Sequence, residues 1–224
     1  MNNALDRKLV GQAVYEKLRN DIVTGHLKPE QKLKLNQLKE TYNVSVNTLR
    51  ETLMRLVAEG FVSFEDQKGF RVIPVSIADL EELIELRGTL EMLGLEKSFE
   101  RRDTLIDWKS RLISAHFRLS CAEKLMMEDE AQHVTAWEKA DRDFHTAIVS
   151  NCGSKQLIRY HASVIELYMR YQVLALSQRP FRGKEVMAEH QELVQRLLDD
   201  DIEGAKSLLS LHISRGSQTP KATV

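Results

Sequence analysis

Residues 35–60 read LNQLKETYNVSVNTLRETLMRLVAEG, and this stretch indicates two amphipathic helices separated by a short turn. The first helix is expected over residues 35–42, where Asn43 stops it. Ser45 is a good N-cap for the second helix, Val46 to Ala58, which places its apolar residues on one face. Two helices joined in this way predict a helix-turn-helix.

The flanking segments complete a larger motif. Apolar residues recur with a helical period from Leu9 to Ile22, and Gly25 ends that helix. Downstream, short strands are expected at residues 61–64 and 70–73, with a turn-forming segment between them. The order of helix, short helix, turn, helix and hairpin predicts a winged helix-turn-helix domain over residues 1–75.

A winged helix-turn-helix inserts the N-terminal end of its second helix into the major groove of double-stranded DNA. The side chains expected to contact operator DNA are those at the start of that helix and at the tip of the wing: Ser45 for phosphate, then Asn47, Thr48, Arg50 and Lys68. Arg50 could pair with a guanine edge or clamp a phosphate. The alternative is a protein-contact module in which Arg50 is merely solvated.

Composition and charge agree with a cytoplasmic DNA-binding protein without excluding others. Residues 1–75 contain 12 Lys and Arg against 9 Asp and Glu, whereas the remainder contains 20 against 24. This imbalance suits phosphate contact by the first domain but is too small to prove it. The sequence shows no signal peptide, no apolar run of membrane-spanning length and no metal spacing of its 2 cysteines, so no membrane association is expected.

The rest of the chain, residues 76–224, predicts an antiparallel all-α bundle, which makes the fold class mainly α. Pro74 ends the second strand, and no strand-like alternation follows it. Helices are expected at about residues 77–100, 103–125, 129–151, 154–178, 183–199 and 202–214.

Four residues of the bundle form a candidate metal site. Asp141 and His145 are spaced i, i+4 and share a helix face. His190 lies near the start of one expected helix and His212 near the end of the next, so antiparallel packing would bring them to the same level. Three neutral imidazoles and one carboxylate suit zinc first, with nickel or manganese possible. The alternative is an Asp141–His145 ion pair and histidines with ordinary surface or core roles.

The first domain resembles the DNA-binding domain of the GntR family. The resemblance rests on VYEKLRNDIVTG at residues 14–25, TLRETLMRLVAEG at 48–60 and KGFRV at 68–72. Many family members have Arg where this chain has Val46 and Pro where it has Thr48, so base preference is not carried over. The resemblance implies a bacterial transcription factor. A homodimer is expected because each chain has one small DNA-binding domain and an acidic helical body large enough to pair, and a symmetric dimer would recognise a near-palindromic operator.

The bundle resembles the FCD sensor domain of the FadR branch of that family. DRDFHTAI at residues 141–148, EHQEL at 189–193 and His212 match the pattern of its metal-binding members, which supply an Asp and three His ligands. The resemblance implies a small organic acid as effector, with Arg87 as its counter-charge, and ligand-controlled repression. The alternative for Arg87 is an exposed side chain paired with Glu91 in the same helix.

A metal-dependent hydrolase using the same Asp and His set is the other function considered. The sequence lacks the His-Asp dipeptide expected of common helical phosphohydrolases, and only Glu189 stands near the ligands as a general base. A hydrolase would also leave the winged domain unexplained. A pure dimerisation scaffold would leave the ligand set unexplained, so a regulator remains the preferred interpretation.

Overall fold

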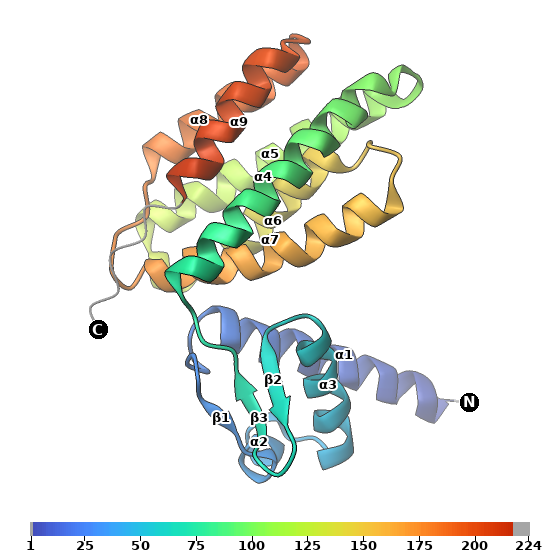
Figure 1. Ribbon diagram of the computed structural model, residues 1–224, viewed down its shortest axis with the longest axis vertical. Coiled ribbons are helices and arrows are strands. Elements are labelled where there is room, and N and C mark those ends of the chain that lie inside the picture. The colour runs from blue at the N-terminus through green and yellow to red at the C-terminus, as the bar shows by residue number, and fades with distance from the viewer. Residues whose placement is uncertain (1, 217–224) are drawn as a thin grey trace. The chain divides into compact units, whose positions relative to one another are not determined.

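The computed structural model describes residues 2–216, with side chains from residue 9 onward, and the chain divides into two compact units between Ser76 and Ile77 (Figure 1). The outer ends of the two predicted domains, residue 1 and residues 217–224, lie outside the described residues. Each unit has its own hydrophobic core and is described by itself.

The N-terminal unit is a winged helix-turn-helix. Its elements are α1 (Asn2–Val23), β1 (Lys32–Leu33), α2 (Leu35–Tyr42), α3 (Val46–Ala58), β2 (Val62–Glu65) and β3 (Gly69–Val72). Asn43 ends α2 in a left-handed conformation with a φ of 51°, and Ser45 caps α3 by accepting a hydrogen bond from the backbone N–H of Thr48 at 3.1 Å. The core consists of fully buried side chains from α1, α3 and the segment that follows: Leu18, Ile22, Leu49, Leu53, Leu56 and Phe61.

The wing is a three-stranded antiparallel sheet in the order β1-β3-β2, not only the hairpin that the sequence predicts. The hairpin is present with its strands shifted by about one residue, and Gly69 leaves the turn with a φ of 81°, which favours glycine. The additional strand β1 has 2 residues, too few to produce a period-2 pattern in the sequence.

The C-terminal unit is an antiparallel helical bundle, and the predicted fold class is confirmed. Its helices are α4 (Ile77–Glu100), α5 (Leu105–Glu128), α6 (Glu130–Val149), α7 (Lys155–Ala175), α8 (Lys184–Leu198) and α9 (Ile202–Arg215), with a 3₁₀ turn at Arg102–Thr104. Helix α5 packs against α6, α4 against α7, and α8 against α9 (Figure 1). Among the described residues, no helix combines the length and apolar character needed to cross a membrane.

Two close contacts fix α6 within the bundle. Trp108 of α5 is fully buried, and its Nε1–H donates to the carbonyl oxygen of Ala147 at 2.9 Å. On α4, a Cβ added to Gly94 would lie 2.5 Å from Cγ1 of Val149, so glycine allows α4 and α6 to approach closely. Glu91 lies one turn before Gly94 on α4, and His145 lies one turn before Val149 on α6. The close approach of the two helices therefore places Glu91 beside His145.

Candidate metal centre and DNA-binding surface

Three histidines from three helices form a buried cluster in the C-terminal unit. His145 comes from α6, His190 from α8 and His212 from α9, and one ring nitrogen of each lies within 4.8 Å of the others. The α8–α9 hairpin brings His190, near the start of one helix, to His212, near the end of the next. The arrangement has the spacing that a single metal ion requires of imidazole ligands.

A glutamate orients each imidazole of this cluster. The Nδ1 atom of every ring lies within hydrogen-bond distance of a carboxylate, as seen in the pairs His145–Glu91 (2.9 Å), His190–Glu123 (2.7 Å) and His212–Glu189 (2.8 Å). A carboxylate at Nδ1 fixes the tautomer and the ring orientation and leaves Nε2 free to ligate. Consistent with this, Nε2 of both His145 and His190 is buried without a hydrogen-bond partner.

Asp141, the fourth predicted ligand, lies on α6 one turn before His145. Its side chain is buried, and its Oδ1 atom is 3.8 Å from Nε2 of His190. The structure therefore brings all four predicted ligands into one region, with the three imidazoles as the tighter set.

Burial keeps two imidazoles of the cluster, those of His145 and His212, neutral. Desolvation lowers the pKa of His145 to about 3, and it lowers that of His212 to about 3 as well. The pKa of Glu189 falls to about 2, because hydrogen bonds from His212 and Arg215 outweigh the opposing effect of burial. His145 and His212 are thus neutral, which is the protonation state that an imidazole needs to ligate a metal.

Arg87 of α4 lies in the same unit and is buried, so the alternative of an exposed Arg87 is wrong, although its pairing with Glu91 is present. Its Nε–H donates to Oε1 of Glu91 at 2.7 Å, and its guanidinium lies 4.3 Å from the centre of the Tyr168 ring. The Nη2 atom is buried with no hydrogen-bond partner. A cavity is lined by several polar groups, among them Arg87, Asp141, Tyr168, Arg179, Arg182 and His212.

Sequence reasoning missed most of the carboxylates around the histidines. Glu123 is a buried acid on the apolar face of α5, one turn from both Leu119 and Met126, and this interruption of an apolar stripe is a signal that could have revealed it. Likewise, His161 has no evident partner in the sequence, yet it is buried with Nε2 at 3.2 Å from Oε1 of Glu91.

In the N-terminal unit, the predicted DNA-contacting residues lie at the start of α3 and in the wing. Asn47 and Arg50 are exposed, whereas Thr48 is half-buried and its hydroxyl is 2.9 Å from that of Ser45. Lys68 lies in the turn between β2 and β3, where its side chain is 77% exposed and pairs with Glu65 at 2.6 Å. The exposed ammonium of Lys68 remains accessible to a phosphate, because a surface ion pair is weak.

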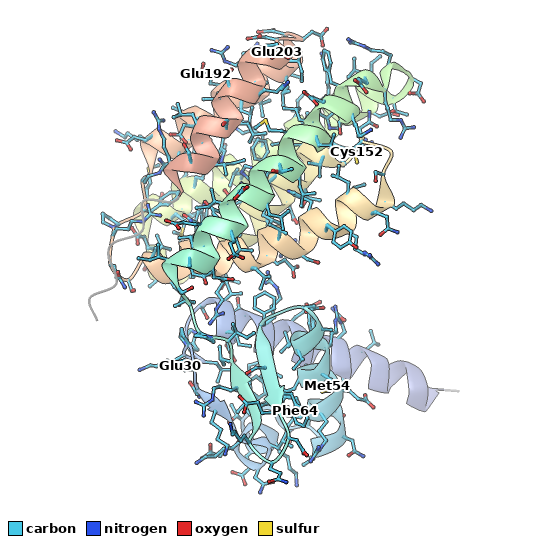
Figure 2. The ribbon with its side chains drawn as sticks, viewed as in Figure 1. Glu30, Met54, Phe64, Cys152, Glu192 and Glu203 are labelled. Carbon is cyan, nitrogen blue, oxygen red and sulfur yellow. The ribbon has the colours of Figure 1, made fainter. Side chains whose placement is uncertain are left out.

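Arg50 and Lys68 line a shared groove between α3, the start of α2 and the wing. Two further cations, Lys32 and Lys34, line it as well, and none of its lining residues in the described part of the chain is acidic. Both lysines are exposed on either side of buried Leu33, and this alternation of charged and apolar residues is a sequence signal that could have identified them. Phe64, exposed and labelled in Figure 2, lies in the same groove. This groove has the charge that a phosphate backbone requires.

Each of the two units matches a known family model. Residues 10–72 match the family model "Bacterial regulatory proteins, gntR family", and residues 82–215 match the FCD domain. The chain is 38% identical over 204 residues to the HTH-type transcriptional regulator BphR of Paraburkholderia xenovorans, covering 90% of this chain and 81% of BphR. It is 30% identical to the HTH-type transcriptional repressor GlaR of Escherichia coli, covering 89% of this chain and 90% of GlaR.

Solved structures share the fold. A GntR transcriptional regulator from Rhodococcus sp. RHA1 superimposes with a TM-score of 0.72 at 22% identity, covering 92% of this chain and 95% of that one. Escherichia coli McbR/YncC gives a TM-score of 0.70 at 20% identity, with 92% and 94% covered. The curated relatives are transcriptional regulators rather than enzymes, so the metallohydrolase alternative is wrong. The chain therefore belongs to the gntR family of bacterial regulatory proteins, and it is a DNA-binding transcriptional regulator whose C-terminal unit is an effector-binding FCD domain.

Proposed function

We propose that this protein represses transcription and that a small carboxylate, bound beside a divalent metal in the FCD domain, controls its affinity for operator DNA. The observation that carries the proposal is the buried cluster of His145, His190 and His212, with each Nδ1 held by a glutamate. Burying three imidazoles and their carboxylates is costly unless the free ring nitrogens gain a partner.

The donor set fits a transition metal. Three imidazole nitrogens, with the Asp141 carboxylate as fourth ligand, favour zinc first, and nickel or manganese would also suit them. The orphaned Nε2 atoms of His145 and His190 support this assignment, because each imidazole would otherwise bury an unsatisfied nitrogen. When bound, such an ion would supply a Lewis-acid position for a carboxylate oxygen.

Arg87 supports a carboxylate as the effector. Its guanidinium lines the same cavity as Asp141 and His212, and its Nη2 group lacks a hydrogen-bond partner. A carboxylate in the cavity would satisfy that donor and offset the buried positive charge.

The regulatory step would be a shift between two states of the FCD domain with different operator affinity. Repression as the sign of control is supported by the relative GlaR, which is named a repressor. We further propose a cytoplasmic homodimer that binds a near-palindromic operator, because each chain has one small DNA-binding unit and symmetric dimers recognise paired half-sites.

Two measurements test this proposal. Elemental analysis of protein purified without chelator or affinity tag should find about one equivalent of a transition metal per chain. A thermal-shift screen against small organic acids should identify an effector that stabilises the metal-loaded protein and not the chelator-treated one. Less than about a tenth of an equivalent of metal, with none taken up on addition of zinc, nickel or manganese, would remove the site.

The DNA-binding part has its own test. The effector found in the screen should weaken binding to a duplex from the gene's upstream region, and a mass measurement should give a dimer at micromolar concentration. A monomer, or a footprint without two-fold symmetry, would contradict the dimer. Tighter operator binding in the presence of the effector would contradict relief of repression by the effector.

A further inference from the structure

Glu189 contacts both an arginine that lines the cavity and a histidine of the cluster. Its Oε2 atom accepts a hydrogen bond from Nη2 of Arg182 at 2.9 Å and lies 2.8 Å from Nδ1 of His212. Arg182 belongs to the loop between α7 and α8 and lines the cavity. One carboxylate oxygen is therefore shared between a cavity arginine and an imidazole of the histidine cluster.

Glu91 makes the same connection on the other side of the cluster. Its Oε1 atom accepts from Nε of Arg87 at 2.7 Å, and its Oε2 atom lies 2.9 Å from Nδ1 of His145. Arg87 also lines the cavity. Two of the three imidazoles are thus linked through a glutamate to an arginine that an anion in the cavity could reach. In the described part of the chain, Glu123 holds His190 and pairs with no arginine.

The charges determine how these links affect metal binding. A carboxylate at Nδ1 makes the opposite ring nitrogen a stronger donor to a metal. A guanidinium on the same carboxylate draws its negative charge away and adds a positive charge close to the cation site, and both effects weaken cation binding. An anion that pairs with the arginine removes part of this opposition.

We infer that Arg182–Glu189–His212 and Arg87–Glu91–His145 are two coupling bridges. Through them, an anion bound in the cavity increases the affinity of the site for the metal, and the bound metal increases the affinity of the cavity for the anion. This inference rests on the proposed metal and carboxylate function and adds its regulation. Linkage requires the two effects to be equal in free energy. Arg182 and Arg87 are then positioning residues that set metal affinity without contacting the metal.

Replacement of Arg182 by Gln imitates the neutralised arginine and tests the bridge with zinc alone. Zinc affinity, measured by competition with a chromophoric chelator, should increase about tenfold in Arg182→Gln. Arg182→Lys keeps the charge and should stay close to the wild-type affinity. The matched control is Lys184→Gln, which removes the same charge from an exposed residue two positions further on and should have little effect.

A double mutant distinguishes an effect transmitted through Glu189 from a general electrostatic effect of the Arg182 charge on zinc binding. Glu189→Gln should weaken zinc binding by about 10- to 100-fold, and in that background Arg182→Gln should have little further effect. Three outcomes would overturn the bridge and leave the proposed function standing. They are a zinc affinity of Arg182→Gln equal to that of the wild type, a change in Lys184→Gln as large as that in Arg182→Gln, and an effect of Arg182→Gln that is undiminished in the Glu189→Gln background. A wild-type protein that takes up no metal would instead overturn the proposed function, and the bridge with it.

Discussion

The Nδ1 atom of His190 lies 2.7 Å from Oε1 of Glu123, and both residues are fully buried, on helices α8 and α5. Burial raises the pKa of Glu123, although the hydrogen bond from His190 opposes that change. A carboxylate is costly at such a position unless it is paired, and the contact with His190 supplies that partner.

Substitution Glu123→Gln should lower metal affinity by about 10- to 100-fold, because an amide oxygen keeps the geometry but loses the charge that strengthens the imidazole as a ligand. Competition with a chromophoric chelator measures this change. Glu128→Gln, at the exposed end of the same helix, is the matched control and should match the wild type. An unchanged affinity in Glu123→Gln would show that Glu123 has only a structural role.

Removal of single ligands should lower metal content. Asp141→Ala, His145→Ala, His190→Ala and His212→Ala should each retain less metal after dialysis than the wild type, as measured by elemental analysis. His133→Ala is the control, since His133 lies near the start of α6, away from the cluster. His161 is not a suitable control because it contacts Glu91. Metal content equal to that of the wild type in all four variants would contradict the assignment.

The free energy of unfolding of the metal-free protein should decrease as the pH is lowered. The pKa of His145 is about 3 in the folded state, as is that of His212, whereas the unfolded chain has the ordinary value of 6.5. Between these values the unfolded state binds protons that the folded state excludes, so folding is favoured fully above pH 6.5 and progressively less below it.

Each of these two histidines contributes up to about 1.4 kcal/mol per pH unit in this window. Urea unfolding of chelator-treated protein from pH 8 to pH 5 measures the slope. The double variant His145→Gln/His212→Gln should flatten it, while His133→Gln should not. A slope that is the same in the wild type and the double variant would contradict the depressed pKa values.

Two substitutions separate base reading from phosphate contact in the N-terminal unit. Arg50→Ala should weaken binding to the operator by about 1–3 kcal/mol if Arg50 contacts a base, with a smaller effect on random duplex. Lys68→Ala should weaken binding to both duplexes similarly and reduce the salt dependence. Lys124→Ala, an exposed lysine of the FCD domain, is the control. Equal losses on operator and random duplex would show that Arg50 contacts phosphate rather than a base.

The elements of this fold follow from local sequence. The α3 helix is predicted with the bounds observed, Val46–Ala58, because an N-cap serine and a regular apolar face act within a few residues of each other. The same holds for α4, Ile77–Glu100, which begins after Pro74 breaks the preceding strand. Strand β1 escapes prediction because its 2 residues are held by pairing with β3, a partner about forty positions away in the chain.

In the candidate site, too, some residues could be predicted from the sequence and others only from the tertiary structure. Residue type and spacing make Asp141, His145, His190 and His212 candidates, because side chains one turn apart share a helix face and consecutive antiparallel helices align their ends. The resemblance to the FCD domain selects these four as a ligand set. The glutamates that hold the imidazoles come from other helices, and Glu91 and Glu123 reach them only where α4 and α5 pack against α6 and α8. Burial, which depends on that packing, decided that Arg87 is enclosed and that His145 and His212 are neutral.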